Sequence, residues 1–157
     1  MNIMIRPASV SDNVIIAEFN AFMAKETENL ELDRELLRRG TEALLADSSK
    51  GIYYLAETGD KVIGQLMVTY EWSDWRNATF WWIQSVYVLP EYRKNGVFHK
   101  LYYYVESLAR THGNVCGLRL YVDTSNKHAQ QTYEAIGLKR SHYQMMDMDF
   151  DLNRHSS

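Results

Sequence analysis

The stretch Gln-Ser-Val-Tyr-Val-Leu-Pro-Glu-Tyr-Arg-Lys-Asn-Gly-Val-Phe-His-Lys-Leu, residues 84–101, decides how this chain folds. An apolar strand ends at Pro90, a short basic loop with one glycine follows, and an amphipathic helix opens directly after it. Unpaired amides at a helix N-terminus and the helix dipole together favour a bound anion such as a phosphate. The positive charges of Arg93 and Lys94 reinforce this preference. An ordinary strand–loop–helix connection with solvated charges fits the stretch equally well, because short glycine-containing loops are common.

The overall composition is typical of a globular protein with one domain. The chain has 157 residues, of which 46% are hydrophobic and 24% charged, and this allows a proper core. A net charge of −3 provides no basic field for nucleic acid or for an anionic membrane surface. The histidines are scattered and form no His-x-x-x-His pair, so we expect no metal site.

The sequence also predicts the compartment in which the protein works. No uninterrupted apolar run is long enough to cross a bilayer, and the N-terminal residues contain no secretory segment. Cys116 is the only cysteine, so no disulfide can form within the chain. These features predict a cytoplasmic protein.

Hydrophobic periodicity and turn residues predict the element order β-α-α-β-β-β-α-β-α-β. The first helix follows a cap at Ser9 and carries an apolar stripe over 14–23. Other helices are predicted over 33–46, 97–111 and 127–136, and strands over 3–6, 52–57, 62–72, 79–88, 115–122 and 142–150. This order indicates a single α/β domain with a mixed central sheet over residues 1–153, followed by a frayed tail at 154–157.

Two motifs in the second half of the chain point to a family. Residues 93–98, Arg-Lys-Asn-Gly-Val-Phe, follow the pattern Gln/Arg-x-x-Gly-x-Gly/Ala except at Phe98. The second motif, Asn-x-x-Ala-x-x-x-Tyr-x-x-x-Gly-Phe/Leu, is matched in register by Asn126, Ala129, Tyr133, Gly137 and Leu138. At this spacing and in this element order, the chain resembles the GNAT superfamily of acyl-CoA-dependent N-acetyltransferases. The Ile-Arg-Pro-Ala start and the Asp-Trp pair at 74–75 also look similar to its polyamine and diamine branch.

The resemblance implies a cofactor site for acetyl-CoA, the acetyl donor, beside a splayed pair of strands, 79–88 and 115–122. Its residues would be Val86, Tyr87 and Val88 for the pantetheine arm, Arg93, Lys94, Asn95, Gly96, Val97, Phe98 and His99 for the pyrophosphate, and Asn126 and Tyr133. Phe98 stands where the family prefers a small residue. Its ring either points into the core beside Leu101 or distorts the loop, and its helix face, shared with Leu101, favours the core.

The resemblance further implies that Tyr133 is the general acid that protonates the departing thiolate. A phenol with an ordinary pKa of about 10 carries its proton at neutral pH. Many relatives have a glutamate base at the position of Gln84, which cannot take a proton but can orient an amine. The amine would then bind neutral or lose its proton to water near Glu71, Asp74 or Glu28. We expect Gln84 and Glu28 to border the substrate.

The leading interpretation is transfer of an acetyl group to the primary amine of a small molecule such as a polyamine, a diamine or an amino-acid-like compound. Acetylation of a protein N-terminus or lysine is the alternative enzyme reaction. A non-catalytic acyl-CoA-binding module is the alternative from another class, because Gln84 and Phe98 depart from the family's pattern. The resemblance and the large number of aromatic residues in the C-terminal half predict a homodimer.

Overall fold

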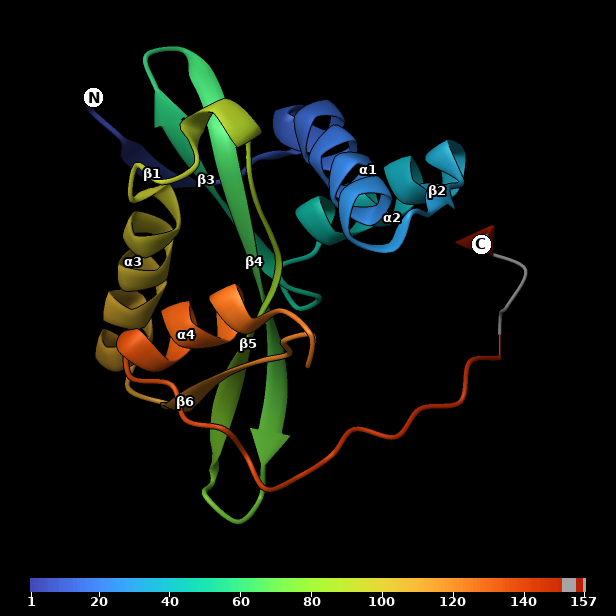
Figure 1. The fold of residues 1–157 in the computed structure, drawn as a ribbon. Coiled ribbons are helices and arrows are strands. Elements are labelled where there is room, and N and C mark those ends of the chain that lie inside the picture. Colours follow the sequence, from blue (N-terminus) through green and yellow to red (C-terminus); the bar gives the residue numbers. More distant parts are fainter. Residues whose placement is uncertain (151–154, 157) are drawn as a thin grey trace.

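The computed structural model describes residues 1–150 and 155–156 (Figure 1). The strands are β1 (Met4–Pro7), β2 (Glu31–Leu32), β3 (Ile52–Thr58), β4 (Lys61–Ser73), β5 (Ala78–Val88), β6 (Val115–Leu120) and β7 (His155–Ser156). The helices are α1 (Asn13–Glu28), α2 (Arg34–Ala46), α3 (Val97–Thr111) and α4 (Lys127–Ala135), with short 3-10 turns η1 (Val10–Asp12) and η2 (Pro90–Tyr92). The predicted helices are confirmed, and so are the strands that make the central sheet.

The central sheet has the strand order β1-β3-β4-β5-β6. Neighbouring strands from β1 to β5 pair antiparallel, and β5 pairs parallel with β6. This confirms the mixed α/β sheet. Helices α1 and α2 cover one face of the sheet and α3 covers the other (Figure 1). The loop before α3 follows directly after β5, so it lies at the C-terminal end of that strand.

The core lies mainly between the sheet and α3. Leu101 and Val105 of α3 are fully buried there, against strand residues that include Ile63 and Leu66. A smaller cluster on the other face centres on Ile16 and gathers under α1. Each such buried aliphatic side chain contributes about 1.5–3 kcal/mol. The apolar stripe along 97–111 thus fixes where α3 begins and which of its faces points away from solvent.

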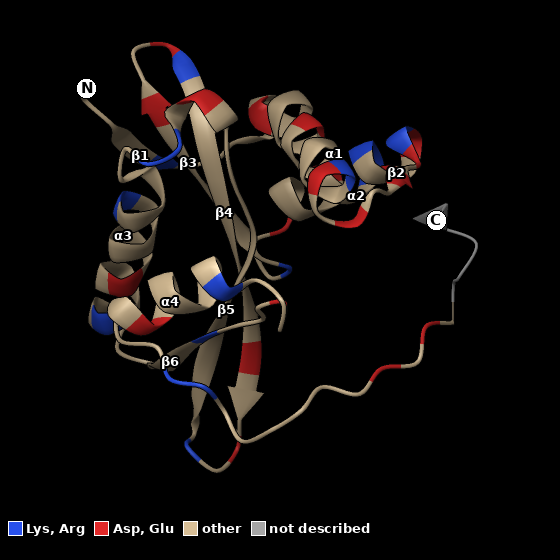
Figure 2. Cartoon of the chain, viewed as in Figure 1, with Lys and Arg blue, Asp and Glu red and all other residues tan. Residues whose placement is uncertain are grey.

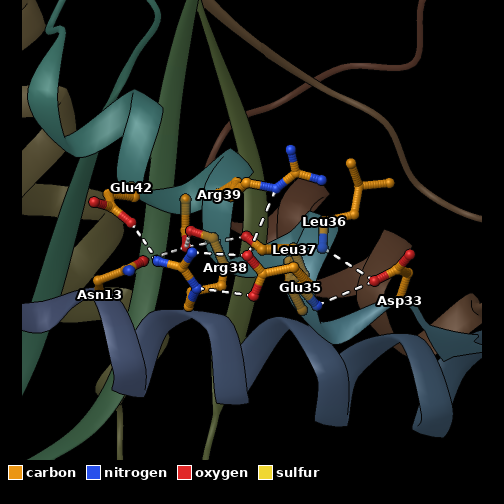
Figure 3. A network of polar contacts seen from close by, with 9 residues as sticks. Asn13, Asp33, Glu35, Leu36, Leu37, Arg38, Arg39 and Glu42 are labelled. Carbon is orange, nitrogen blue, oxygen red and sulfur yellow. Dashed lines mark hydrogen bonds and ion pairs between the residues drawn. The ribbon is translucent and has the colours of Figure 1, made fainter.

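Helix α2 is held by its cap and by polar contacts along its length (Figure 3). The carboxylate of Asp33 accepts hydrogen bonds from the amides of Glu35 and Leu36, both at 3.1 Å, which satisfies two amides of the first turn. The hydroxyl of Thr41 donates to the side chain of Asn13 in α1. Helices α1 and α2 are therefore joined by a partly buried bond.

The predicted strand 142–150 is wrong. Residues 139–150 form no helix or strand, and all of residues 141–150 are exposed. The alternating pattern indicates which side chains favour burial, but a strand also needs a neighbouring strand. Among the described residues, nothing pairs with the outer edge of β6. His155 and Ser156 pair instead with β2. Of the tail predicted to fray, residues 154 and 157 lie outside the described residues, as do 151–153 at the end of the predicted domain.

Within residues 1–150 and 155–156, no helix is both long and apolar enough to cross a membrane.

Candidate functional site

The first feature of the site is the parting of β5 from β6. The parallel pairing ends where Ile83 meets Leu120, the last residue of β6, while β5 continues to Val88. Over residues 84–88, the β6-side edge of β5 therefore has no strand partner within residues 1–150 and 155–156. Tyr87 is buried in this stretch, and Val86 and Val88 are half-buried. Unpaired backbone groups at such an edge can bind an extended ligand as a further strand would.

A β-bulge lies within this part of β5. The register with β4 shifts between Gln65 and Met67, and Ser85 has a positive φ of 51°. Such a backbone conformation costs energy in a residue other than glycine, and it persists where surrounding contacts hold it. A bulge also redirects the backbone groups of its strand.

A buried amide that the sequence analysis did not single out holds this bulge. The Nε2 atom of Gln65, which is 0% exposed, donates at 3.0 Å both to the carbonyl oxygen of Ser85 and to Oδ1 of Asn20. Asn20 in turn donates to the hydroxyl of Tyr53 at 2.9 Å. The signal in the sequence was one polar residue inside the apolar run 62–68 of β4. The other polar side-chain atom of Gln65, Oε1, has no hydrogen-bond partner among the described residues.

The loop before α3 has the geometry of an anion site. Gly96 is the N-cap of α3 with φ 77°, and no described side chain caps the first turn. Lys94 also has a positive φ, of 64°, and Asn95 steadies the turn by donating to the carbonyl oxygens of Tyr92 and Arg93. A Cβ built at Gly96 would meet nothing within 4 Å, so the space in front of the helix is open. The amides at the start of α3 therefore face room for an oxyanion.

The residues that open α3 divide between core and solvent. Val97 is buried, and its Cγ1 atom lies where a Cβ on Gly64 of β4 would come within 3.1 Å. Glycine at position 64 thus allows the start of α3 to sit close against the sheet. His99 is exposed, with its ring 6.3 Å from that of Tyr103.

The side chain of Arg93 points to α1 and β5. Its guanidinium donates to both carboxylate oxygens of Glu26, at 2.7 and 3.0 Å, and its Nε donates to the carbonyl oxygen of Val88 at 2.9 Å. It also lies over the ring of Tyr87, 5.4 Å from the centroid. These hydrogen bonds hold the pKa of Glu26 below its ordinary value. The last turn of α1 is therefore tied to the loop before α3.

Phe98 and Tyr133 meet where α3 approaches α4. Phe98 packs against the core cluster that contains Leu101, as its helix face predicted. Its ring is edge-on to that of Tyr133, with the centroids 5.6 Å apart. Burial raises the pKa of Tyr133 above its ordinary value of 10.0, so the hydroxyl keeps its proton at neutral pH. Asn126 caps α4 by accepting a hydrogen bond from the amide of Ala129 at 3.1 Å.

The face of β5 that carries Trp82 and Gln84 is polar and aromatic. The amide of Gln84 donates to the hydroxyl of Thr69 at 2.6 Å. Further along this face, the carboxylate of Glu71 accepts from the indole of Trp82 at 2.8 Å and from Arg119 at 3.0 Å. Within the part of the chain that the structure describes, no hydrogen bond or ion pair joins Gln84 to Glu28.

Glu28 is exposed at the end of α1. The described residues contain no cluster of three or more potential metal-ligating side chains.

Comparison with known proteins identifies the fold. The profile of the Acetyltransferase (GNAT) family matches residues 16–138. The structure is similar to a possible acetyltransferase from Clostridium difficile 630, with 46% identity, a TM-score of 0.89, and coverage of 95% of this chain and 98% of that one. No match was found among curated proteins.

More distant structures share the fold alone. A ribosomal-protein-alanine N-acetyltransferase from Brucella melitensis biovar Abortus 2308 has 15% identity and a TM-score of 0.76, with coverage of 95% of this chain and 99% of that one. An aminoglycoside acetyltransferase from an uncultured soil metagenomic sample has 17% identity and a TM-score of 0.75, with the same coverage. Because the family profile spans most of the chain and the fold and both motifs agree with it, the protein belongs to the GNAT family of acetyltransferases.

Proposed function

We propose that this N-acetyltransferase acetylates the primary amine of a small molecule, such as a polyamine, a diamine or an amino-acid-like compound, by direct attack in a ternary complex. The observation that carries the proposal is the open, uncapped start of α3 beside an unpaired length of β5. The first feature suits a diphosphate, and the second suits an extended amide-containing chain. GNAT acetyltransferases use acetyl-CoA, which contains both chemical groups.

The residues present fit this cofactor. Backbone amides of residues 94–99 would hold the pyrophosphate, and backbone groups of Val86, Tyr87 and Val88 would hold the pantetheine arm. Bound acetyl-CoA supplies an activated acetyl thioester. The side chain of Asn126 already caps α4, so its contribution to the cofactor would come from its remaining polar atoms. Because most of this site is backbone, Phe98 does not obstruct it.

The acceptor would lie on the face of β5 that carries Gln84. The ion pair between Glu26 and Arg93 ties the end of α1 to the cofactor loop, which favours a small acceptor over a protein segment. Glu28 on the same turn adds negative charge, which would attract a cationic amine. The single cysteine supports a cytoplasmic site of action.

Tyr133 and Gln84 would share the chemical work. Gln84 orients the neutral amine, whose nitrogen forms the new bond to the acetyl carbon. As the C–S bond breaks, the Tyr133 hydroxyl gives its proton to the sulfur and is reprotonated from solvent. The proton lost by the amine goes to water. The backbone at the Ser85 bulge would donate to the thioester oxygen, in a position held by Gln65.

Calorimetry with acetyl-CoA and the purified protein tests the cofactor site. We expect one molecule bound per chain. Gly96→Asp should abolish binding by placing a negative charge beside the pyrophosphate. Gly96→Asn is the matched control, because it has the same shape without charge and tolerates the positive φ, so it should retain most of the affinity. No binding to the wild-type protein at millimolar acetyl-CoA would refute the proposal.

A panel of amines, with detection of released thiol, tests the reaction. Turnover of small primary amines and none of peptides supports the proposed acceptor. Turnover of peptides alone would assign the protein-acetylating alternative. Cofactor binding without turnover of any amine would indicate a non-catalytic acyl-CoA-binding module.

A further inference from the structure

Two arginines lie over one buried ring on the sheet face that carries Gln84. Because side chains alternate along a strand, Phe80 and Trp82 of β5 share this face with Gln84. The guanidinium carbon of Arg119 is 3.6 Å from the centroid of the Phe80 ring, and that of Arg76 is 5.3 Å from it. Two cationic side chains therefore meet at one aromatic ring, farther along β5 than Gln84.

A glycine of β6 makes room for this ring. A Cβ atom at Gly117 would lie 2.9 Å from Cε1 of Phe80, which is closer than side-chain carbons approach. The Phe80 ring therefore packs against the backbone of β6, and Arg119 of the same strand stacks on it. Stacking on an aromatic face holds a guanidinium in place without using its N–H groups.

Most hydrogen-bond donors of Arg119 remain available to a ligand. Its Nη1 atom donates to Oε1 of Glu71 at 3.0 Å, and the same oxygen accepts from the indole of Trp82 at 2.8 Å. The Nε and Nη2 atoms of Arg119 have no acceptor within residues 1–150 and 155–156. Since the side chain of Arg119 is 39% exposed, an acceptor from solution can reach them.

Arg76 adds a positive charge that is paired with no carboxylate of the described residues. Arg76 is exposed, and the nearest acid in the sequence, Asp74, accepts from the amide of Trp75 at 3.0 Å. In Figure 2, basic positions lie along β6 and at the turn between β4 and β5, at the end of the sheet far from α1. The two guanidiniums at Phe80 are thus matched by one hydrogen-bonded carboxylate, that of Glu71.

We propose that the acceptor amine carries a carboxylate at its far end, and that Arg119, with Arg76 beside it, binds this group. The inference rests on the proposed function, which leaves polyamines, diamines and amino-acid-like compounds open, and it selects the last of these. A carboxylate accepts two parallel hydrogen bonds from a guanidinium and brings a negative charge to two cations. A second ammonium group in the same place would be repelled by both arginines.

The spacing along β5 sets the length of this acceptor. The amide of Gln84 reaches Thr69, the residue that pairs with Trp82, whereas the guanidinium of Arg119 lies over Phe80. Successive side chains on one face of a strand are about 7 Å apart. An α-amino acid, in which one carbon separates the amine from the carboxylate, is too short for this span. A chain of several methylene groups fits it.

Aromatic rings line the path between the two ends. Trp82 is half-buried, and its ring centroid lies 4.4 Å from that of Tyr121, which is 58% exposed. Methylene groups that pack on these rings leave water, which is favourable. The chemical class that fits the whole surface is therefore an aliphatic ω-amino acid, with its amine at Gln84 and its carboxylate at Arg119.

Three amines with six carbons each test what the far end of the acceptor must be. The chain of ε-aminocaproate ends in a carboxylate, that of n-hexylamine in a methyl group, and that of hexamethylenediamine in a second ammonium group. At saturating acetyl-CoA, we expect kcat/KM for ε-aminocaproate to exceed that for either of the others by about 10–100-fold.

Substitutions at Arg119 show whether this preference comes from the guanidinium. Arg119→Gln should lower kcat/KM for ε-aminocaproate to near that for n-hexylamine, and leave n-hexylamine within about twofold of the wild type. Arg119→Lys, which keeps the charge without the paired donors, should fall between the two. Arg39→Gln, at an exposed arginine of α2, is the matched control and should change nothing. An equal loss for all three amines in Arg119→Gln would assign Arg119 a structural role and overturn the proposal.

Binding of caproate gives a readout that needs no turnover. This probe has the carboxylate and no amine, and saturation-transfer NMR measures its affinity. We expect binding to the wild type that weakens about tenfold or more in Arg119→Gln. Equal kcat/KM for the three amines, or caproate binding that ignores the substitution, would overturn the carboxylate site and leave small-amine acetylation in place. Caproate binding through Arg119 without turnover of any amine would refute the proposed function and leave the carboxylate site standing.

Discussion

Arg93 and Glu26, 67 positions apart in the sequence, form a bidentate ion pair in which each carboxylate oxygen accepts one hydrogen bond. The two side chains are 40% and 44% exposed, and pairs at such exposure contribute about 0–1 kcal/mol to stability. The importance of this pair therefore lies in position. It sets the distance between the end of α1 and the loop that precedes α3.

Glu26→Gln should loosen the acceptor side of the site more than the cofactor side. The neutral amide holds Arg93 weakly, so the end of α1 moves more freely while the amides of α3 stay in place. We expect the KM for the amine to rise about three- to tenfold, and the Kd for acetyl-CoA to stay within about twofold. Glu18→Gln, an exposed change on the same helix, is the control. A larger effect on acetyl-CoA than on the amine would contradict this assignment.

Tyr133→Phe should lower kcat about 10²–10⁴-fold, with little change in acetyl-CoA affinity. In the proposed mechanism the hydroxyl acts only as the C–S bond breaks, and the ring that contacts Phe98 remains. Because burial raises the pKa of this phenol above 10.0, no loss of activity from its ionisation should be seen below that pH. Single-turnover kinetics separates the chemical step from product release. A change in that step of less than about twofold would remove the general-acid role.

Gln84→Glu should move the acid limb of the pH–rate profile to lower pH. A carboxylate at this position can accept the proton of the amine, and the hydroxyl of Thr69, now 2.6 Å from the amide, can rotate to donate to it. The profile of kcat/KM measures the effect. Gln84→Met, which can neither accept a proton nor orient the amine, should lower the rate at every pH. An unchanged profile in Gln84→Glu would show that base assistance is not what limits the wild type.

Gln65→Met should impair both stability and rate. The change removes the donors to Asn20 and to the carbonyl of Ser85, and leaves one buried and one partly buried acceptor without this partner. We expect a loss of about 1–3 kcal/mol in the free energy of unfolding and a fall in kcat as the bulge relaxes. Met67→Leu on the same strand is the control. If stability falls while kcat holds, the buried amide supports the fold alone.

Asp12→Asn should weaken the fold at neutral pH and flatten its response to acid. Asp12 accepts two hydrogen bonds from Arg6, at 2.8 and 2.9 Å, and one from the amide of Ser9. The bonds from Arg6 lower the pKa of Asp12 below its ordinary value of 3.8.

The stabilisation from Asp12 is therefore complete above pH 3.8 and is lost as the pH falls through the lower folded pKa. Since Arg6 is 36% exposed, we expect a loss of only about 1–2 kcal/mol at pH 7. Urea unfolding between pH 2 and about pH 7 measures both effects. An equally steep acid limb in Asp12→Asn would assign that limb to other carboxylates.

Local patterns predicted most of the fold because most of its elements are defined by local chemistry. The apolar stripe of 97–111 determines a helix without information from elsewhere in the chain. The prediction of a strand over 142–150 was wrong for the opposite reason. Its alternation records a preference for burial, whereas a strand exists only where a second edge is supplied.

The site was predictable where it depends on motif spacing and unpredictable where it depends on long-range contacts. The position of Gly96 before a helix followed from the sequence, and so did the orientation of Phe98. The contact of Arg93 with Glu26 did not, because a basic loop residue gives no sign of which acid it will meet. The role of Gln65 was missed because its partners, Asn20 and Ser85, lie on other elements.

The parallel pairing of β5 with β6 has a consequence for the order in which the protein opens. β3, β4 and β5 follow one another through short turns, whereas β6 joins β5 only after the whole of α3 has been crossed. Closing the longer loop costs more chain entropy, whereas the pairing that it allows covers only five residues of β5. Amide hydrogens of β6 should therefore exchange with solvent before those of β4. The two strands that flank the proposed cofactor site would then separate while the rest of the sheet stays folded.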